Sequence, residues 1–314
     1  MTTPMPRHRS DSAAIVGALR HAAPYIRMFK GKTFVVKASG GVFGDDAMMR
    51  ALMEQVAILQ HVGIRVVIVH GGGPQLTEIQ QSLGIEPRMI GGRRVTDEKS
   101  IAVTSMVLNG LVNTQILSMC RELGINAVGI SGVAAGLIRA HKRPPQEIEG
   151  KMVDFGFVGD IDLVDAKVLQ QLLDDGAMPV VSPVSADVSG ALLNINADTV
   201  ASAIGAALKA EKLIICAEPP GIMESLDDPH SLVSYTDLDG LKKLRERGCL
   251  KDGVLPKAKA IEDAIKGGVR RVHITSYRSP DGILAEVFTN EGAGTLIVAD
   301  LKALSPAEQG TDGR

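Results

Sequence analysis

Residues 33–74, TFVVKASGGVFGDDAMMRALMEQVAILQHVGIRVVIVHGGGP, contain the pattern that decides the fold. Two short apolar runs, at 33–36 and 66–69, each end in a glycine-rich turn, and a stretch with apolar residues at helical spacing lies between them. Continuous apolar runs of this length are typical of strands that are buried on both faces. The pattern therefore predicts a strand, helix, strand unit with parallel strands and a right-handed crossover.

The rest of the sequence continues this alternation of strands and helices. Further short apolar runs predict strands at 126–129, 180–182, 212–216, 271–275 and 295–299. Residues 137–163, in which turn residues and apolar residues alternate, predict a hairpin insert. We therefore expect an α/β fold, a three-layer αβα sandwich around a mostly parallel open sheet, with ligands at the carboxyl ends of the strands. No long linker interrupts the chain, so two lobes should share the sheet, with a seam near 185–195.

Composition argues against several classes of protein. Of the 314 residues, 45% are hydrophobic and 22% charged, and the formal net charge is −2, so neither a nucleic-acid nor a membrane partner is indicated. Cys120, Cys216 and Cys249 form neither a disulfide framework nor a zinc motif, and no metal site is expected. Residues 1–12 lack the apolar run of a secretory signal, and no stretch reaches the roughly 18 apolar residues of a membrane span. These features favour a cytoplasmic enzyme.

Lys37 and the two glycine-rich turns form the first candidate for a binding site. Lys37 ends the first predicted strand just before Gly40 and Gly41, and the turn at 71–73 follows the second strand. Backbone N–H groups in such turns bind anions, and a lysine at a strand end can neutralise phosphate charge. Neither turn matches the Walker A or dinucleotide-binding motif. Tight turns beside a solvated lysine are the alternative, although two such turns on neighbouring strands point toward a phosphate site.

Three further motifs contain candidate binding residues. The segment 194–198, NINAD, offers two amides and a carboxylate. Asp198 could be only an N-cap, or it could orient two lysines, and Asn194 could hold a carboxylate substrate. Lys257, at the start of another predicted helix, could stabilise a leaving phosphate oxygen, although many helices begin with proline and a nearby lysine. Arg94, in GRRVTD, could clamp a carboxylate through two parallel hydrogen bonds, or it could be a solvated loop residue.

Together these residues predict a phosphoryl-transfer site with an acidic acceptor. Lys37 and Lys257 would flank a γ-phosphate, and Asp198 would hold both lysines. Arg94 and Asn194 would grip the acidic substrate. A carboxylate acceptor is already ionised at neutral pH and needs no general base. No histidine or cysteine in the sequence is evidently paired for proton abstraction or nucleophilic attack, which agrees with such an acceptor.

Across these motifs the chain resembles the acetylglutamate kinases of the amino-acid kinase family, from about residue 20 to residue 300. The resemblance rests, in family order, on PYIRMFKGKTFVVK, VVIVHGGGPQ, GRRVTDEKS, MVLNGLVN, GFVGDI, LNINADTVASAIGAALKAEKLI, LPKAKAIEDAIKGGVRRVHI and FTNEGAGTLI. It implies transfer of the γ-phosphoryl group of ATP, with Mg²⁺ carried by the nucleotide, to the side-chain carboxylate of N-acetyl-L-glutamate. The product would be N-acetyl-L-glutamyl 5-phosphate, formed in the second step of arginine biosynthesis.

The resemblance also implies a role for each residue of the motifs. The implied catalytic residues are Lys37, Asp198 and Lys257. The residues implied to bind the acceptor substrate are Gly72, Gly73, Arg94 and Asn194. The residues implied to bind phosphate or ATP are Gly40, Gly41, Ala217, Glu218 and Gly221. The residues implied at an arginine effector site are Tyr25, His273, Glu291 and Gly294.

The implied domain organisation places an amino-acid kinase domain at 31–300. Its lobe 31–190 would bind acetylglutamate, and its lobe 191–300 would bind the nucleotide. Residues 1–12 are expected to be a disordered tail and residues 301–314 a flexible C-terminus. The helix predicted at 13–30 resembles the N-terminal extension of hexameric, arginine-inhibited family members. It implies a role in oligomerisation, a homo-oligomer that is a dimer at least and a hexamer by this resemblance, and L-arginine as a candidate feedback inhibitor.

Four segments depart from the family pattern. Ser39 stands at the first glycine of the usual Lys-x-Gly-Gly, and residues 131–134, SGVA, replace Ser-Gly-Lys-Asp. Residues 217–221, AEPPG, replace Thr-Asp-Val-x-Gly near the expected nucleotide, and residues 276–278, SYR, replace Asp-Gly-Arg. Two other functions stay open: a kinase for a related acyl or carrier-linked acidic amino acid, and a weakly active regulatory homologue that binds arginine or acetylglutamate.

Overall fold

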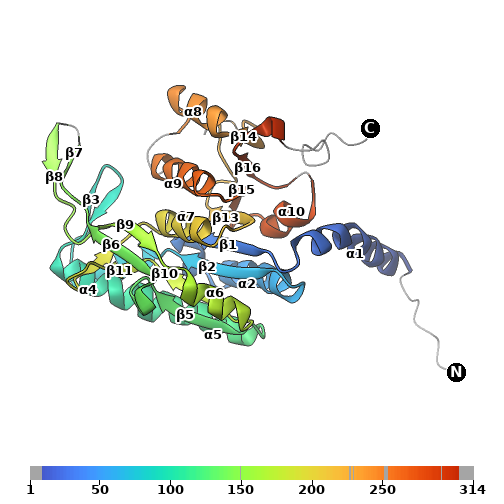
Figure 1. Cartoon of the computed structure of the whole chain (residues 1–314), viewed down its shortest axis with the longest axis horizontal. Helices are drawn as coiled ribbons and strands as arrows, with labels where there is room; N and C mark the ends of the chain where they lie inside the picture. Colours follow the sequence, from blue (N-terminus) through green and yellow to red (C-terminus); the bar gives the residue numbers. More distant parts are fainter. Residues whose placement is uncertain are drawn as a thin grey trace.

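An eight-stranded sheet runs through the centre of the molecule in the computed structural model (Figure 1). The structure describes residues 9–148, 150–225, 228, 230–250, 254–290 and 292–303. In spatial order the strands are β14 (Tyr235–Asp237), β16 (Thr295–Val298), β15 (Arg271–Ser276), β13 (Lys212–Ala217), β1 (Thr33–Ala38), β2 (Arg65–His70), β10 (Met178–Ser182) and β5 (Ala127–Ser131). Every pair of neighbours is parallel except β15 and β16. The predicted mostly parallel open sheet is therefore confirmed.

Helices cover both faces of this sheet and complete the predicted three-layer sandwich. Successive residues of β1 point to opposite faces, so Phe34 and Val36 join one apolar cluster and Val35 joins the other. Among the helices that contribute to the cluster of Phe34 are α2 (Asp46–His61), α5 (Asn113–Glu122) and α10 (Gly282–Phe288). The helices that contribute to the cluster of Val35 are α6 (Lys167–Asp174), α7 (Ala197–Ala207), α8 (Leu238–Glu246) and α9 (Val254–Lys266).

The predicted insert at 137–163 contains four strands that extend the first half of the chain. A four-stranded sheet has the order β12 (Leu192–Asn194), β11 (Val184–Ala186), β6 (Ile138–Lys142) and β9 (Gly159–Val164). Two separate hairpins are β3 (Arg88–Ile90) with β4 (Arg93–Val95), and β7 (Gln146–Ile148) with β8 (Lys151–Val153). In Figure 1, β3 and the β7–β8 hairpin rise above this smaller sheet. Strands of three residues carry too little periodicity to be predicted, which is why β3, β4, β11, β12 and β14 were missed.

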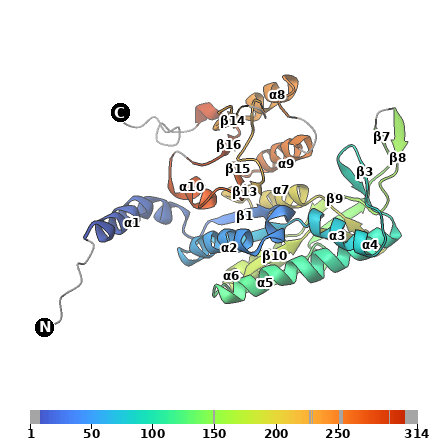
Figure 2. The ribbon, with the colours of Figure 1, turned by 180° about the vertical axis from the view of Figure 1, so that it is seen from behind.

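The N-terminal helix α1 (Arg9–Phe29) is longer than predicted and projects from the body of the protein in both views (Figures 1 and 2). It begins four residues before the predicted start at residue 13 and continues through Pro24. Residues 9–12 are therefore helical rather than part of a disordered tail. Residues 1–8 and 304–314 lie outside the described residues, and residues 301–303 form a short 3₁₀ turn.

One continuous helical segment, Glu98–Glu122, joins α4 (Glu98–Ser105) to α5 through a π-helical stretch, Met106–Val112. By length and composition alone this segment could cross a membrane, with a mean hydropathy of 1.3 in its most apolar window. Half of that window is buried inside the fold, however, and core helices of soluble proteins pass the same test. The segment is therefore weak evidence for a membrane span.

Candidate active site

The carboxyl ends of the parallel strands meet at one edge of the sheet, where β1 lies between β13 and β2. This is the point at which the strand order reverses, and crevices at such points bind ligands in open α/β sheets. Lys37 lies near the end of β1, and the loop that follows His70 of β2 continues into α3 (Gly73–Ser82). Asp198 lies in the first turn of α7 and Lys257 in α9.

Asp198 connects the two predicted catalytic lysines. Its Oδ1 lies 2.8 Å from Lys37 Nζ, and its Oδ2 accepts a hydrogen bond from Lys257 Nζ at 3.1 Å. All three side chains are largely buried, with exposures of 11% for Asp198, 8% for Lys37 and 13% for Lys257. Asp198 is not the N-cap of α7, because Asn196 takes that position and its side chain accepts from the Asp198 amide at 2.8 Å.

Electrostatics keep this cluster charged. Burial alone would raise the pKa of Asp198, but the charges and hydrogen bonds of Lys37 and Lys257 outweigh it and lower the pKa to about 2. Burial lowers the pKa of Lys257, although the Asp198 carboxylate opposes that shift. The carboxylate therefore stays ionised at neutral pH and holds two ammonium groups side by side. Such a pair of cations suits a ligand with several negative charges.

The two glycine-rich turns approach each other so closely that only glycine fits. A Cβ atom on Gly40 would lie 2.8 Å from Gly73 N and 2.9 Å from Gly72 Cα. A Cβ on Gly72 would lie 2.5 Å from the Leu108 side chain. Ser39, at the position where the family pattern has glycine, accepts a hydrogen bond from Lys37 Nζ at 2.9 Å. The serine hydroxyl thus helps to hold the lysine beside the turns.

Arg94 lies on β4 and Asn194 on β12, two strands outside the central sheet. Two side chains of α3 that the sequence did not indicate as functional orient the guanidinium: Arg94 donates to Gln80 Oε1 at 2.6 Å and to Thr77 Oγ1 at 2.7 Å. Arg94 also donates to the Gly73 carbonyl at 3.3 Å, which joins it to the second glycine turn. Asn194 Nδ2 donates to Thr96 Oγ1 at 3.3 Å, two residues beyond Arg94. Gln80 follows Leu76 by four residues and shares its buried face of α3, so a polar side chain at helical spacing from an apolar one was the available signal.

The predicted nucleotide segment follows β13, the strand beside β1. Ala217 ends β13, and Glu218 forms an ion pair with Arg278 at 2.7 Å. The Glu218 carbonyl also accepts from Ser276 Oγ at 2.6 Å. Residues 217–221 and 276–278, two of the four segments that depart from the family pattern, are therefore bonded to each other. A Cβ on Gly41 would lie 2.4 Å from the Tyr277 hydroxyl, so the second of these segments also touches the first glycine turn.

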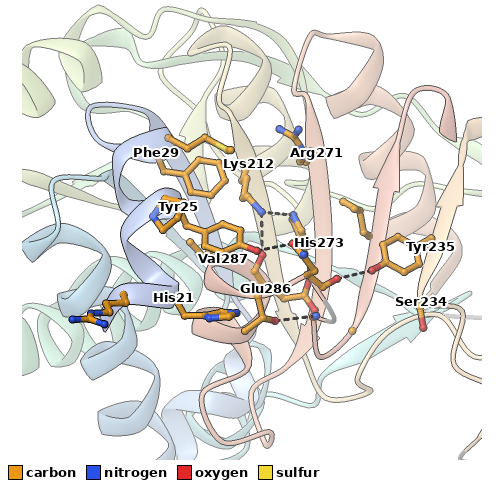
Figure 3. Close-up of a pocket in the computed structure, with 18 residues that line it drawn as sticks. His21, Tyr25, Phe29, Lys212, Ser234, Tyr235, Arg271, His273, Glu286 and Val287 are labelled. Atoms are coloured by element: carbon orange, nitrogen blue, oxygen red, sulfur yellow. Dashed lines mark hydrogen bonds and ion pairs between the residues drawn. The ribbon is translucent and has the colours of Figure 1, made fainter. Parts of the chain in front are cut away.

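A separate cavity of about 460 Å³ lies where α1 meets α10 and β15 (Figure 3). Three of the predicted effector residues, Tyr25, His273 and Gly294, line it, and Glu291 lies outside the described residues. The carboxylate that faces His273 belongs to Glu286, which the sequence reasoning missed. Glu286 Oε2 lies 2.5 Å from His273 Nδ1, and both side chains are 4% exposed. An acidic residue beside buried Ile283 and Val287, on the apolar face of α10, was the signal for it.

The donor set beside Asp198 does not form a metal cage. Among the residues that the structure describes, no group of three histidine, cysteine, aspartate or glutamate side chains could hold a metal ion. Both Asp198 oxygens already lie beside lysine ammonium groups. A magnesium ion that enters with a nucleotide fits this site only as an ion held mainly by phosphate oxygens.

Comparison with known proteins identifies the family. Residues 32–276 match the Amino acid kinase family. The chain belongs to the amino acid kinase family. This membership confirms the resemblance found in the sequence, and the two bonded lysines lie on elements inside the matched range.

Named relatives of this amino acid kinase are similar over nearly their whole length. The chain is 45% identical over 296 residues to the acetylglutamate kinase of Myxococcus xanthus, covering 92% of this chain and 96% of that protein. It is 41% identical over 285 residues to the acetylglutamate kinase of Archaeoglobus fulgidus, covering 90% of this chain and 98% of that protein.

Solved structures share the fold. N-acetylglutamate synthase from Neisseria gonorrhoeae, complexed with coenzyme A and N-acetyl-glutamate, has 26% identity and a TM-score of 0.78, and the alignment covers 91% of this chain. This chain spans just 63% of that synthase chain. The same synthase complexed with coenzyme A and L-arginine gives 25% identity and a TM-score of 0.74, over 91% of this chain and 65% of that one. Carbamate kinase from Giardia lamblia bound to AMP-PNP, at 18% identity and a TM-score of 0.62, shows the fold alone over 86% of this chain and 99% of that one.

Proposed function

We propose that this amino acid kinase is an acetylglutamate kinase, which transfers the γ-phosphoryl group of MgATP to the side-chain carboxylate of N-acetyl-L-glutamate. The observation that carries the proposal is the Lys37–Asp198–Lys257 cluster beside two close-packed glycine turns. Relatives from two organisms that match at least 90% of this chain carry the same name. The product, N-acetyl-L-glutamyl 5-phosphate, belongs to arginine biosynthesis, and we expect the enzyme to act in the cytoplasm.

The reaction requires no proton transfer. The ionised acceptor carboxylate attacks the γ-phosphorus and forms a new O–P bond, while the bond from that phosphorus to the β–γ bridging oxygen breaks and ADP leaves with the electron pair. Negative charge grows on the bridging oxygen and on the transferring group. Lys37 and Lys257 stabilise that charge because Asp198 already holds both ammonium groups in place. Magnesium on the nucleotide supplies further neutralisation of phosphate charge when it is bound.

The acceptor would lie between Arg94 and the second glycine turn. Gln80 and Thr77 fix the guanidinium of Arg94 in one orientation, so that an entering carboxylate meets a pre-organised donor group. Asn194 and the Gly73 amide would supply the remaining donors to the substrate, and the Gly72 amide would face the phosphoryl group that is transferred to it. The nucleotide would lie toward β13, with Gly40, Gly41 and the segment 217–221 around it.

A coupled assay tests this function directly. The purified enzyme with MgATP and hydroxylamine should convert N-acetyl-L-glutamate into an acyl hydroxamate, because hydroxylamine traps the acyl phosphate. We expect turnover in the usual range of about 1–100 per second for such phosphotransferases. N-acetyl-L-aspartate, one methylene shorter, serves as the matched control and should react at least about tenfold more slowly.

Two outcomes of this assay would replace the proposal. Product from another acyl or carrier-linked acidic amino acid, without product from acetylglutamate, would identify a kinase with a different acceptor. Binding of acetylglutamate or arginine without product from any acceptor would identify a weakly active regulatory homologue.

We also propose that the cavity beneath α1 binds L-arginine as a feedback inhibitor. Glu286 supplies a buried carboxylate that suits a guanidinium. Burial raises its pKa, but His273, the Ala293 amide and the Lys212 charge together outweigh burial and lower the pKa overall. Burial lowers the pKa of His273 to about 4, so the ring stays neutral. Lys212 Nζ donates to His273 Nε2 at 3.1 Å and to the Glu286 backbone carbonyl at 3.0 Å, so one cation already lies beside this pair in the wall of the cavity (Figure 3). A fold relative was solved with L-arginine.

The test of this effector site is an arginine titration. Millimolar arginine should inhibit the wild-type enzyme, and Glu286→Gln should raise the half-inhibiting concentration about tenfold or more, because one charge-assisted hydrogen bond contributes about 1.5–3 kcal/mol. Glu224→Gln, which alters an exposed partner of Arg247, is the matched control, and arginine should inhibit this variant at the same concentration as the wild type. A flat response of the wild-type enzyme up to millimolar arginine would contradict the proposal.

We infer that α1 contacts another copy of the chain. Its exposed large apolar side chains are Ile15, Val16, Leu19 and Met28. These residues lie on a helix that projects from the body, where no other described element covers them (Figure 2). Association would remove this apolar surface from water. This supports a homo-oligomer, at least a dimer and a hexamer by analogy with arginine-inhibited family members.

A further inference from the structure

His70 is a fully buried, titratable side chain that the proposed chemistry does not use. It ends β2 immediately before the second glycine turn and has 0% exposure. Its Nδ1 lies 3.0 Å from the Gly71 carbonyl oxygen, and its Nε2 lies 3.1 Å from Asn113 Nδ2. The Phe43 ring packs edge-on against the imidazole, with centroids 6.1 Å apart. The imidazole therefore connects the core of the sheet to the backbone of the turn.

The hydrogen bonds of Asn113 determine which nitrogen of His70 carries the proton. Asn113 Nδ2 lies 3.0 Å from the Val180 carbonyl, which can only accept, so the atom there must be the amide nitrogen. Its second hydrogen then points to His70 Nε2, which must accept. The proton of a neutral ring is left on Nδ1, where it is donated to the Gly71 carbonyl. Burial lowers the pKa of His70 to about 4, so the ring is neutral at physiological pH.

A glycine on the neighbouring strand β5 leaves room for the Asn113 side chain. A Cβ on Gly129 of β5 would lie 2.0 Å from Asn113 Oδ1, so a glycine is needed for the amide to reach His70. Asn113 itself is 5% exposed and lies at the start of α5. A buried amide and a buried imidazole that satisfy each other form a rigid unit, because leaving either group unpaired would be costly.

The bond to Gly71 sets the direction of the next amide. The described chain contains no cis peptide bond, and in a trans peptide the C=O and the following N–H point in opposite directions. Fixing the Gly71 carbonyl toward His70 therefore directs the Gly72 N–H away from the core. On its other side, Gly71 N donates to the Ala38 carbonyl at 2.8 Å, so the turn is held at two points. Among the described residues, no hydrogen bond from the Gly72 N–H to a protein atom is present.

We propose that His70 is a positioning residue, which aims the Gly72 N–H at the transferring phosphoryl group by holding the Gly71 carbonyl, with Asn113 selecting the required imidazole tautomer. This inference rests on the proposed function of the site. Pre-organised donors stabilise a transition state more than a ground state, because they need not reorient during the reaction. A change in the direction of the Gly72 N–H should therefore lower kcat more than it raises KM.

Two substitutions of His70 distinguish a role in orienting the Gly72 N–H from a role in packing. In His70→Asn the side-chain amide nitrogen can occupy the place of Nδ1 and still donate to Gly71, whereas in His70→Gln the amide occupies the place of Nε2. Asparagine leaves the larger gap beside Phe43, so a packing role predicts that glutamine is tolerated better. The positioning role predicts the opposite: His70→Gln lowers kcat about 10- to 100-fold with KM nearly unchanged, and His70→Asn stays within about threefold of the wild type.

The measurements are kcat and KM in the hydroxamate assay, the melting temperature, and the affinities for MgADP with and without aluminium fluoride, which mimics the transferring phosphoryl group. His70→Gln should lose about tenfold or more in affinity for the fluoride complex and little for MgADP. This comparison needs no acceptor, so it tests the inference even if acetylglutamate proves not to be the substrate. Nitrogen-15 shifts of the His70 ring should show a protonated Nδ1 in the wild type.

Several results would overturn the inference. One is a kcat or fluoride-complex affinity of His70→Gln that equals or exceeds that of His70→Asn. Another is a wild-type ring protonated on Nε2. A wild-type protein that binds MgADP and its fluoride complex equally would also remove the basis for an aimed donor.

Discussion

Replacing Asp198 with alanine is expected to lower kcat by about three orders of magnitude, since removal of one aimed donor from an active site already costs about 10²–10³. The substitution affects both Lys37 and Lys257, which share this carboxylate as counter-ion. Two buried ammonium groups without a carboxylate repel each other, so they move apart or one loses its proton. Asp198→Asn keeps the shape of the side chain and removes its charge, and it should lose nearly as much activity.

The hydroxamate assay at saturating substrates measures this loss, and thermal unfolding checks that each variant folds. Asp263→Ala is the matched control, because Asp263 pairs with Lys259 at 2.7 Å on the exposed surface of α9. Exposed pairs of this kind contribute about 0.3–0.5 kcal/mol, so both activity and stability should change little. Near-normal turnover of Asp198→Asn would remove the shared carboxylate from the mechanism.

Lys257→Met is expected to lower kcat by about 10²–10³, because a cation beside the leaving oxygen is lost while the volume of the side chain is largely kept. Lys257→Arg keeps the charge and should retain more activity than the methionine variant. The wild type and Lys257→Arg should also differ in how kcat depends on pH. Burial lowers the pKa of Lys257 below the ordinary lysine value of 10.5, so kcat of the wild type should fall as pH rises before that value is reached.

The sign of this effect follows from the charge that catalysis needs. The ammonium form of Lys257 is active and predominates below its pKa, so the activity is lost on the alkaline side. An arginine keeps its proton above pH 12, so Lys257→Arg should show no alkaline decline from this residue. Lys259→Met, on the exposed face of the same helix, is the control and should keep the wild-type profile. An identical alkaline decline in the wild type and in Lys257→Arg would assign the decline to another group.

The decline of kcat at low pH has a different cause from the decline at high pH. The pKa of Asp198 is about 2, so its carboxylate stays charged well below the pH at which an acceptor carboxyl group, near pKa 4.3, becomes protonated. Folded-state depression of the Asp198 pKa adds stability above pH 3.8 that is lost as the pH falls toward 2. An acidic decline in kcat near pH 4 is therefore a property of the acceptor rather than of the lysine cluster.

The sequence by itself determined the elements with strong local patterns. The apolar runs of β1, β2, β13 and β15 are long enough to show burial on both faces, and the glycine turns after β1 and β2 fix where those strands end. The residue types of the site were also readable, because two lysines and two glycine-rich turns at strand ends and a helix start together favour anion binding, although each alone has other common roles. The start of α1 at Arg9 could not be predicted from the sequence, because helix ends depend on contacts and capping that periodicity does not reveal.

Only the tertiary structure decided which of these groups meet. Asp198 and Lys257 are 59 residues apart; the motifs predicted that one carboxylate would hold both lysines, but only the fold brings their side chains into hydrogen-bond distance. Glu286 and His70 were missed because each sits within an apolar stretch, where a polar side chain has meaning only through the partner that the fold places against it. The residues that carry charge are thus readable from the sequence, whereas their partners, protonation and direction are set by long-range packing in a low-dielectric interior.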